Sequence, residues 1–79
     1  MITVKVIEPD GSINEKEIEA GLAAMQKIVG GYIEVAGYYG GDVLIVNEEG
    51  VLMDLPINVH TPHPCIHGTA FLIKREDMK

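Results

Sequence analysis

The stretch that decides the fold is Asp42–Asn47, which reads DVLIVN. The four residues between the aspartate and the asparagine are all apolar, so a strand formed here would be apolar on both faces. Strands of this kind are usually buried on both sides. The last predicted strand, Thr69–Lys74, is nearly as apolar. A sheet that contains these two strands therefore needs a cover on each face.

One helix is predicted over residues 13–29. Ser12 and Glu15 have the spacing of a capping box, in which the serine hydroxyl and the glutamate each accept a hydrogen bond from the other's backbone amide. Gly30 and Gly31 follow and favour a helix end, because glycine adopts the left-handed conformation easily. Apolar residues recur at helical spacing on one face, namely Ile18, Leu22, Met25 and Val29.

Alternation and β-branched residues predict the strands. Pro9-Asp10-Gly11 is a turn after the first of them, and residues 59–68 are an ordered loop. Residues 75–79 are expected to form a polar tail that frays. The predicted strands span residues 2–7, 32–36, 42–47, 51–53 and 69–74.

A single helix packed on a mostly antiparallel sheet of four or five strands is an α+β architecture. At 79 residues the chain forms one domain, residues 1–79. The helix covers one face of the sheet. The other face can be covered by the 54–68 loop or by another subunit, and we expect both, with a homodimer or a higher homo-oligomer.

Composition excludes several classes of function. Twelve acidic and six basic residues give a formal charge of −6, which argues against direct nucleic-acid binding. An acidic face could instead occupy a basic groove on another protein. No apolar run reaches the roughly 18 residues needed to span a bilayer. One cysteine, no disulfide framework and no signal-peptide pattern indicate a cytoplasmic protein.

Several short motifs resemble those of a family of small proteins described only as a domain of unknown function, which is widespread in bacteriophages and mobile elements. The matching stretches are Gly30–Val35, Val46–Gly50 (a V-N-E-x-G hairpin), Leu55–Asn58 (an L-P-x-N step) and Gly68–Ile73. The histidine-rich stretch 60–67 departs from the family pattern. The resemblance implies no reaction and no catalytic residues. It implies an accessory protein that acts inside a bacterium.

Residues His60, His63, Cys65 and His67 form the sharpest cluster of candidate ligands, since imidazole and thiolate are the usual donors to zinc. Structural zinc sites usually join two separated pairs of ligands, and no second pair is present. A proline-rich loop with one buried cysteine and surface histidines is the favoured interpretation, and no metal or cofactor is predicted.

Catalytic machinery is not evident in the sequence. Cys65 and His67 lack an orienting group and an oxyanion hole. Neighbouring carboxylates such as Glu48 and Glu49 point apart and stay solvated. The paired glycines do not fit a phosphate-binding loop. We therefore expect a protein that is not an enzyme.

Two of the four aromatic residues lie in a glycine-rich turn, where they could stack on a planar ligand. If the 54–68 loop meets this turn, a pocket for a small nucleotide-like molecule results. Sequestration of a host signalling molecule in such pockets, at a subunit interface, is the leading hypothesis. The alternative is an acidic inhibitor that binds and blocks a host protein. The predicted ligand-binding residues are Tyr38, Tyr39, Asn58, His60, Thr61, His63 and Thr69.

Overall fold

The computed structural model describes residues 1–78, which form two antiparallel sheets and one short helix. The two shortest strands, β5 (Ile57–Asn58) and β6 (Ile66–His67), pair with each other. The larger sheet contains β1 (Ile2–Ile7), β2 (Ile13–Ile18), β3 (Ile33–Tyr39), β4 (Asp42–Asn47) and β7 (Ala70–Lys74). Its order is β2-β1-β7-β4-β3, and every neighbouring pair is antiparallel.

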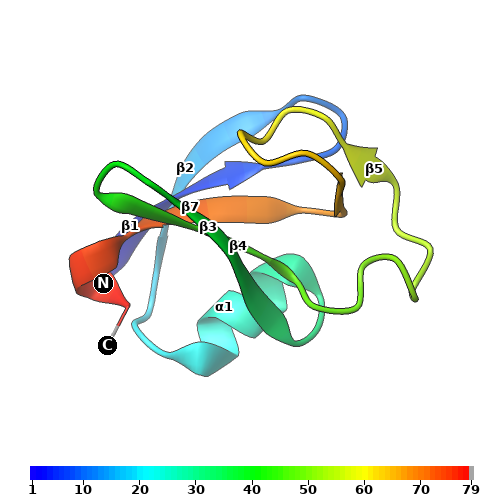
Figure 1. Cartoon of the computed structure of the whole chain (residues 1–79). Helices are drawn as coiled ribbons and strands as arrows, with labels where there is room; N and C mark the ends of the chain where they lie inside the picture. Colours follow the sequence, from blue (N-terminus) through cyan, green and yellow to red (C-terminus); the bar gives the residue numbers. More distant parts are fainter. Residues whose placement is uncertain (79) are drawn as a thin grey trace.

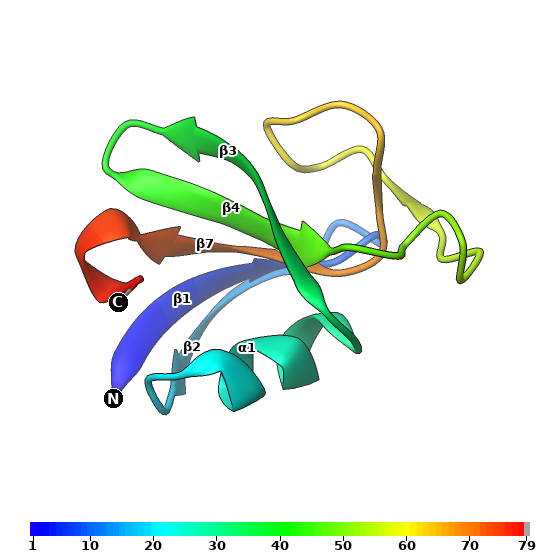
Figure 2. The same ribbon diagram turned by 60° about the horizontal axis from the view of Figure 1, so that its bottom comes forward.

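The helix α1 (Leu22–Val29) lies against one face of the large sheet (Figure 1). Figure 2 shows the segment between β4 and β7 on the other side of the sheet from the helix. One helix on a mostly antiparallel sheet confirms the predicted α+β class. Within residues 1–78, no helix has the length and apolar character that a membrane crossing requires.

The prediction of a helix over residues 13–29 is wrong in its first half. Residues 13–18 form β2, which pairs with β1 in a hairpin from Ile7↔Ile13 to Ile2↔Ile18. Ser12 is part of the hairpin turn, where its amide donates to the Asp10 carboxylate at 2.8 Å and lowers the pKa of Asp10. Six paired positions in the sheet outweigh a local capping pattern, because helix propensity is a weak preference.

The helix itself is only eight residues long. Gly21 precedes it with a φ of 130°, and Gly30 ends it in the left-handed conformation that the sequence predicts. Met25 and Val29 are buried as expected, whereas Leu22 is 54% exposed. The fourth member of the predicted stripe, Ile18, is buried from the strand β2.

The prediction that β4 is buried on both faces is confirmed, since its four central residues are at most 4% exposed. One face of the sheet packs with α1 around Phe71, which is fully buried. The opposite face has its own apolar cluster, in which Leu44, Val46 and Ala70 contact Ile66 of β6.

The chain thus covers the second face of its own sheet with the segment that precedes β7. No second subunit is needed to cover this face of the sheet. The expectation of a homodimer rested on an uncovered face, so that argument no longer applies and the homodimer stays a prediction. The other half of the expectation, a loop folded back over the sheet, is confirmed by the position of Ile66.

Two smaller expectations also need correction. Residues 51–53 form turns and not a strand. In the expected frayed tail, Arg75–Asp77 form a short 3₁₀ helix and Met78 packs against the main core. The remainder of that tail, Lys79, lies outside the described residues.

A substitution in the hairpin turn tests the packing of this turn against His60. Gly11 has a φ of 95°, and a Cβ there would lie 3.3 Å from the His60 ring. We expect Gly11→Ala to lower the free energy of unfolding by about 1–2 kcal/mol in denaturant titrations. Gly41→Ala is the control, because that site is open, and it should change stability by less than about 0.5 kcal/mol. Equal effects would contradict this packing.

Candidate functional site

A buried asparagine holds the segment between β4 and β7, which carries most of the predicted ligand-binding residues. Asn58 is 1% exposed. Its side-chain NH₂ donates to the carbonyl oxygens of Ile7 at 2.9 Å and Gly68 at 3.0 Å. Its side-chain oxygen accepts from the backbone amide of His60 at 3.1 Å. The amide group is thus used by the scaffold, contrary to the predicted role of Asn58 in ligand binding.

A second buried asparagine anchors the other end of the segment. The side-chain NH₂ of Asn47 donates to the carbonyl oxygen of Val29 at 3.0 Å, at the end of α1. Its side-chain oxygen accepts from the amide of Glu49 at 2.7 Å. Gly31 leaves room for this contact, because a Cβ there would lie 3.0 Å from the Asn47 nitrogen. Asn47 therefore joins the helix to the turn that follows β4.

Backbone hydrogen bonds close that turn. The amide of Met53 donates to the carbonyl of Glu49 at 2.8 Å, and the amide of Leu55 donates to Gly50 at 3.0 Å. Gly50 lies so close to β6 that a Cβ would be 2.6 Å from the carbonyl oxygen of His67. The turn is compact and packed against β6, which places Val51 at the surface.

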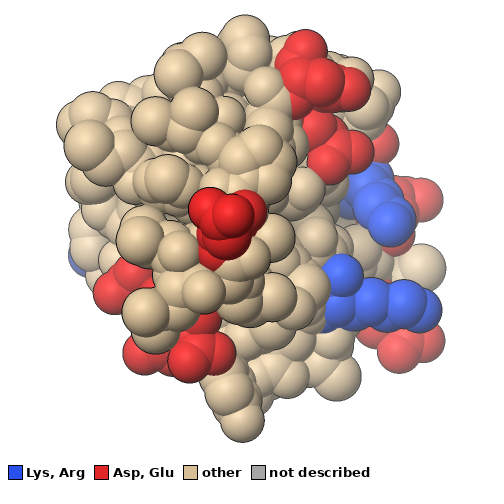
Figure 3. All heavy atoms as spheres, turned by 90° about the vertical axis from the view of Figure 1, so that its right-hand side faces the viewer, with Lys and Arg blue, Asp and Glu red and all other residues tan. Residues whose placement is uncertain are grey.

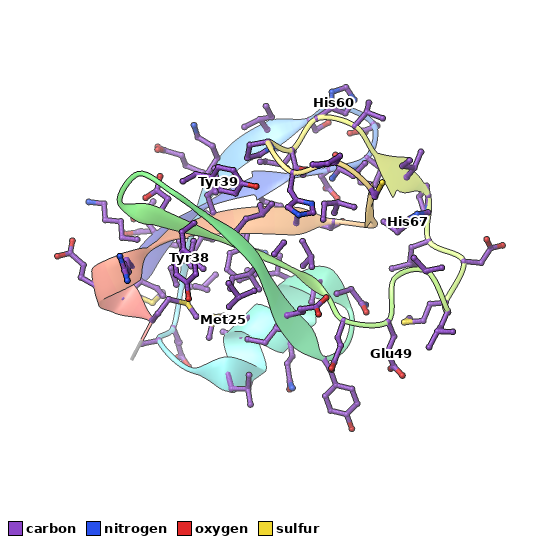
Figure 4. All side chains as sticks on the ribbon, viewed as in Figure 1. Met25, Tyr38, Tyr39, Glu49, His60 and His67 are labelled. Carbon is purple, nitrogen blue, oxygen red and sulfur yellow. The ribbon has the colours of Figure 1, made fainter. Side chains whose placement is uncertain are left out.

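The two tyrosines of the predicted pocket point to opposite faces of the sheet. Tyr38 is 61% exposed, and the guanidinium of Arg75 lies 5.2 Å from the centre of its ring. Tyr39 is partly buried and packs with Leu44 on the face that the loop covers. Successive residues of a strand alternate in direction, and Figure 4 shows the two rings on different sides of the sheet. They cannot form one stacking platform.

The remaining predicted residues mostly hold the loop in place. The His60 ring lies against Gly11, in the turn between β1 and β2. The hydroxyl of Thr61 donates to the carbonyl of His63 at 2.7 Å. The Thr69 hydroxyl donates to the Glu8 carboxylate at 2.8 Å, between the residue after β1 and the residue before β7.

The histidines and the cysteine do not assemble as metal ligands. Nδ1 of His63 donates to the carbonyl of Pro64 at 2.6 Å, and Nδ1 of His67 donates to that of Leu55 at 3.0 Å. Cys65 is exposed, so its interpretation as a buried residue is wrong. Among residues 1–78, no three His, Cys, Asp or Glu side chains lie together in a way that could hold a metal ion.

A hollow of about 540 Å³ lies elsewhere, between β2 and α1. Its apolar lining includes Ile18, Ala24 and Ile28, and two lysines, Lys16 and Lys27, also line it. This volume is typical of small-molecule sites. None of the predicted ligand-binding residues lines this groove, although Thr69 lines an adjoining hollow of about 300 Å³.

Charge is distributed unevenly along the chain and over the surface. No lysine or arginine occurs between Lys27 and Lys74. Figure 3 shows the face that carries the loop: it is mostly uncharged, acidic side chains lie on it and around it, and basic ones gather mainly toward one edge. The carboxylates in this long stretch are Glu34, Asp42, Glu48, Glu49 and Asp54.

Sequence reasoning missed the apolar residues that this face exposes. Leu52 is 83% exposed and Val51 is 70% exposed, although both were expected inside a strand. The signal available in the sequence was the run of three apolar residues, Val51, Leu52 and Met53. The sequence predicts a hairpin loop at residues 48–50, which would pair residues 51–53 with the preceding strand, whereas the structure has turns there.

Removing the Asn58 side chain tests its role as an anchor. We expect Asn58→Ala to lower the free energy of unfolding by about 3 kcal/mol or more, since three backbone groups lose their partner and each buried unpaired group costs about 1–3 kcal/mol. The exposed Asn14 supplies the control, and Asn14→Ala should change stability by less than about 0.5 kcal/mol. Chemical denaturation measures both, and a mild loss for Asn58→Ala would refute the anchor.

Comparison with known proteins identifies a family for this chain but gives no activity. No curated protein matches the chain, and no solved structure does. The family model that matches is described as a domain of unknown function, DUF3846, and it covers residues 2–79. The chain belongs to this family, the domain of unknown function DUF3846.

Proposed function

We propose that this chain is a non-catalytic binding protein that uses its acidic face to bind and block a basic surface of another protein. The carrying observation is the stretch between Lys27 and Lys74, which has five carboxylates and neither lysine nor arginine. Complementary charge speeds association and selects partners. We therefore favour the acidic inhibitor of a host protein, the alternative in the sequence analysis, over the sequestration of a small nucleotide-like molecule.

The leading hypothesis required a pocket that the loops do not build. Tyr38 and Tyr39 lie on opposite faces, and the amide of Asn58 is used by backbone groups. A small molecule could not contact both rings and the asparagine at once. Sequestration of a nucleotide-like molecule in that pocket therefore has little support from the geometry.

The family resemblance of the sequence extends the proposal to the origin of the gene and the cell in which the protein acts. On this proposal, a phage or another mobile element encodes the chain, which acts in the cytoplasm of a bacterial host. The blocked partner is then a host protein with an exposed cluster of lysines and arginines.

Charge reversal on the acidic face tests the proposal. The chain is used to capture proteins from a lysate of the bacterium that carries its gene, at low and high salt. We expect a basic protein to be retained at low salt and released at about 0.5 M salt, where the Debye length falls to a few ångströms. Replacing Glu48 and Glu49 together by lysine should weaken retention roughly tenfold, since each exposed charge contributes up to about 1 kcal/mol.

The matched control reverses two carboxylates at the opposite side of the molecule, Glu17 and Glu19, which are equally exposed. It should retain the partner within about twofold of the unmodified chain. Retention that is insensitive to salt, or equal loss in both double variants, would contradict a role for the acidic face.

A second candidate follows from the groove between β2 and α1. Its apolar lining could hold a planar ring, and Lys16 and Lys27 could pair with phosphate or carboxylate, so a small anionic molecule is the ligand it favours. Glu17 and Glu19 line the same groove and oppose a highly charged ligand.

Calorimetry against a panel of nucleotides tests this candidate. If it holds, a nucleotide binds one site per chain, and Lys16→Glu with Lys27→Glu weakens binding at least about tenfold, while Lys5→Glu, outside the groove, leaves it unchanged. The candidate is abandoned if no nucleotide in the panel binds.

A further inference from the structure

One short segment of the chain, residues 51–59, exposes several large apolar side chains. Within nine residues, five large apolar side chains are about half exposed or more. Monomeric proteins rarely keep a patch of this kind without a function. The exposed residues, which we call the 51–59 patch, are Val51 (70%), Leu52 (83%), Met53 (48%), Ile57 (55%) and Val59 (70%).

The patch is held in place by its surroundings. The turn that carries Val51, Leu52 and Met53 is closed by the hydrogen bonds from Met53 to Glu49 and from Leu55 to Gly50. At the far end, Asn58 between Ile57 and Val59 is buried and bound to three backbone groups. A surface whose backbone is fixed in the free protein loses little conformational entropy on binding, which favours affinity.

Three carboxylates accompany the patch in the chain, namely Glu48, Glu49 and Asp54, and all three are exposed. No lysine or arginine lies in this segment or within twenty positions on its N-terminal side, and His60 directly follows it. Figure 3 shows the corresponding face with acidic groups beside surface that carries neither acidic residues nor lysine or arginine. The binding surface is therefore apolar with a negative border.

This charge pattern indicates which kind of molecule binds the 51–59 patch. A second copy related by two-fold symmetry would bring the same carboxylates together with no basic partner, and like charges at an interface are costly. Nucleic acid and anionic lipid carry the wrong sign. An amphipathic segment with apolar residues on one side and lysines or arginines beside them satisfies both parts of the surface.

We propose that the 51–59 patch is the docking surface for a basic amphipathic segment of a protein partner. This inference rests on the proposed function and adds to it the place of contact and the chemistry of the partner's binding element. The apolar side of the segment covers Val51, Leu52 and Ile57, and its cationic side chains pair with Glu48, Glu49 and Asp54.

A synthetic probe tests the patch without knowledge of the partner. The probe is an 18-residue helical peptide with leucines along one face and lysines elsewhere. Two comparison peptides carry glutamate in place of lysine, or the same composition without an amphipathic order. We expect the ¹⁵N-labelled chain to bind the first peptide, with amide shifts concentrated in residues 48–59, and to bind each comparison peptide at least about tenfold more weakly.

Leu52→Glu and its matched control assign the contact. Leu52→Glu should weaken the binding of the basic peptide at least about tenfold. Leu22→Glu makes the same exchange at an exposed leucine at the start of α1, and it should bind as the unmodified chain does. Thermal melting of both variants verifies that they are folded.

Several results would overturn the inference. They are an absence of binding, shifts outside residues 48–59, equal binding of the acidic peptide, or full binding by Leu52→Glu. Sedimentation that shows a dimer broken by Leu52→Glu would assign the patch to a second copy. If Leu52→Glu still captures the basic protein from the lysate while reversal of Glu48 and Glu49 does not, the patch is wrong and the proposed function stands.

Discussion

The amide group of Asn58 is the contact on which the arrangement of the loop depends. It lies in the interior, donates to the carbonyls of Ile7 and Gly68, and accepts from the amide of His60. These groups belong to the end of β1, the residue that follows β6 and the loop between β5 and β6. A single side chain therefore joins this loop to β1 and to the end of β6, and a buried polar group is tolerated here because its NH₂ group and its oxygen all have partners.

Asn47 has the corresponding role at the other end of the segment, where it joins the end of α1 to the turn after β4. Between the two asparagines the chain leaves the sheet, makes a closed turn and exposes Val51 and Leu52. Folding does not require these side chains at the surface, since Ile66 already covers the sheet beneath the loop. The two buried anchors thus fix a segment whose exposed residues remain available for binding, which connects the scaffold with the proposed function.

Parts of this structure follow from local sequence and others do not. Asp42–Asn47 is predictable because a run that is apolar on both faces has few alternatives to a central strand, and Gly30 ends the helix as its sequence indicates. Residues 13–18 are not predictable in this way, since their local pattern favours a helix and only pairing with β1 makes them a strand. The predicted grouping of the two tyrosines with Asn58 is not observed for the same reason. Tyr38 and Tyr39 are adjacent in sequence but separated by the alternation of β3, and the polar side chain of Asn58 gives no local sign that it is buried.

Native-state hydrogen exchange of three amides tests the central claim, that two buried asparagines hold the binding segment in a fixed shape. The amides of Glu49 and His60 donate to the side-chain oxygens of Asn47 and Asn58, and that of Gly68 donates to the carbonyl of Pro56. The account predicts that all three exchange at least about a hundredfold more slowly than in an unstructured peptide. Exchange of the Glu49 and His60 amides at the rates of an unstructured peptide would contradict it.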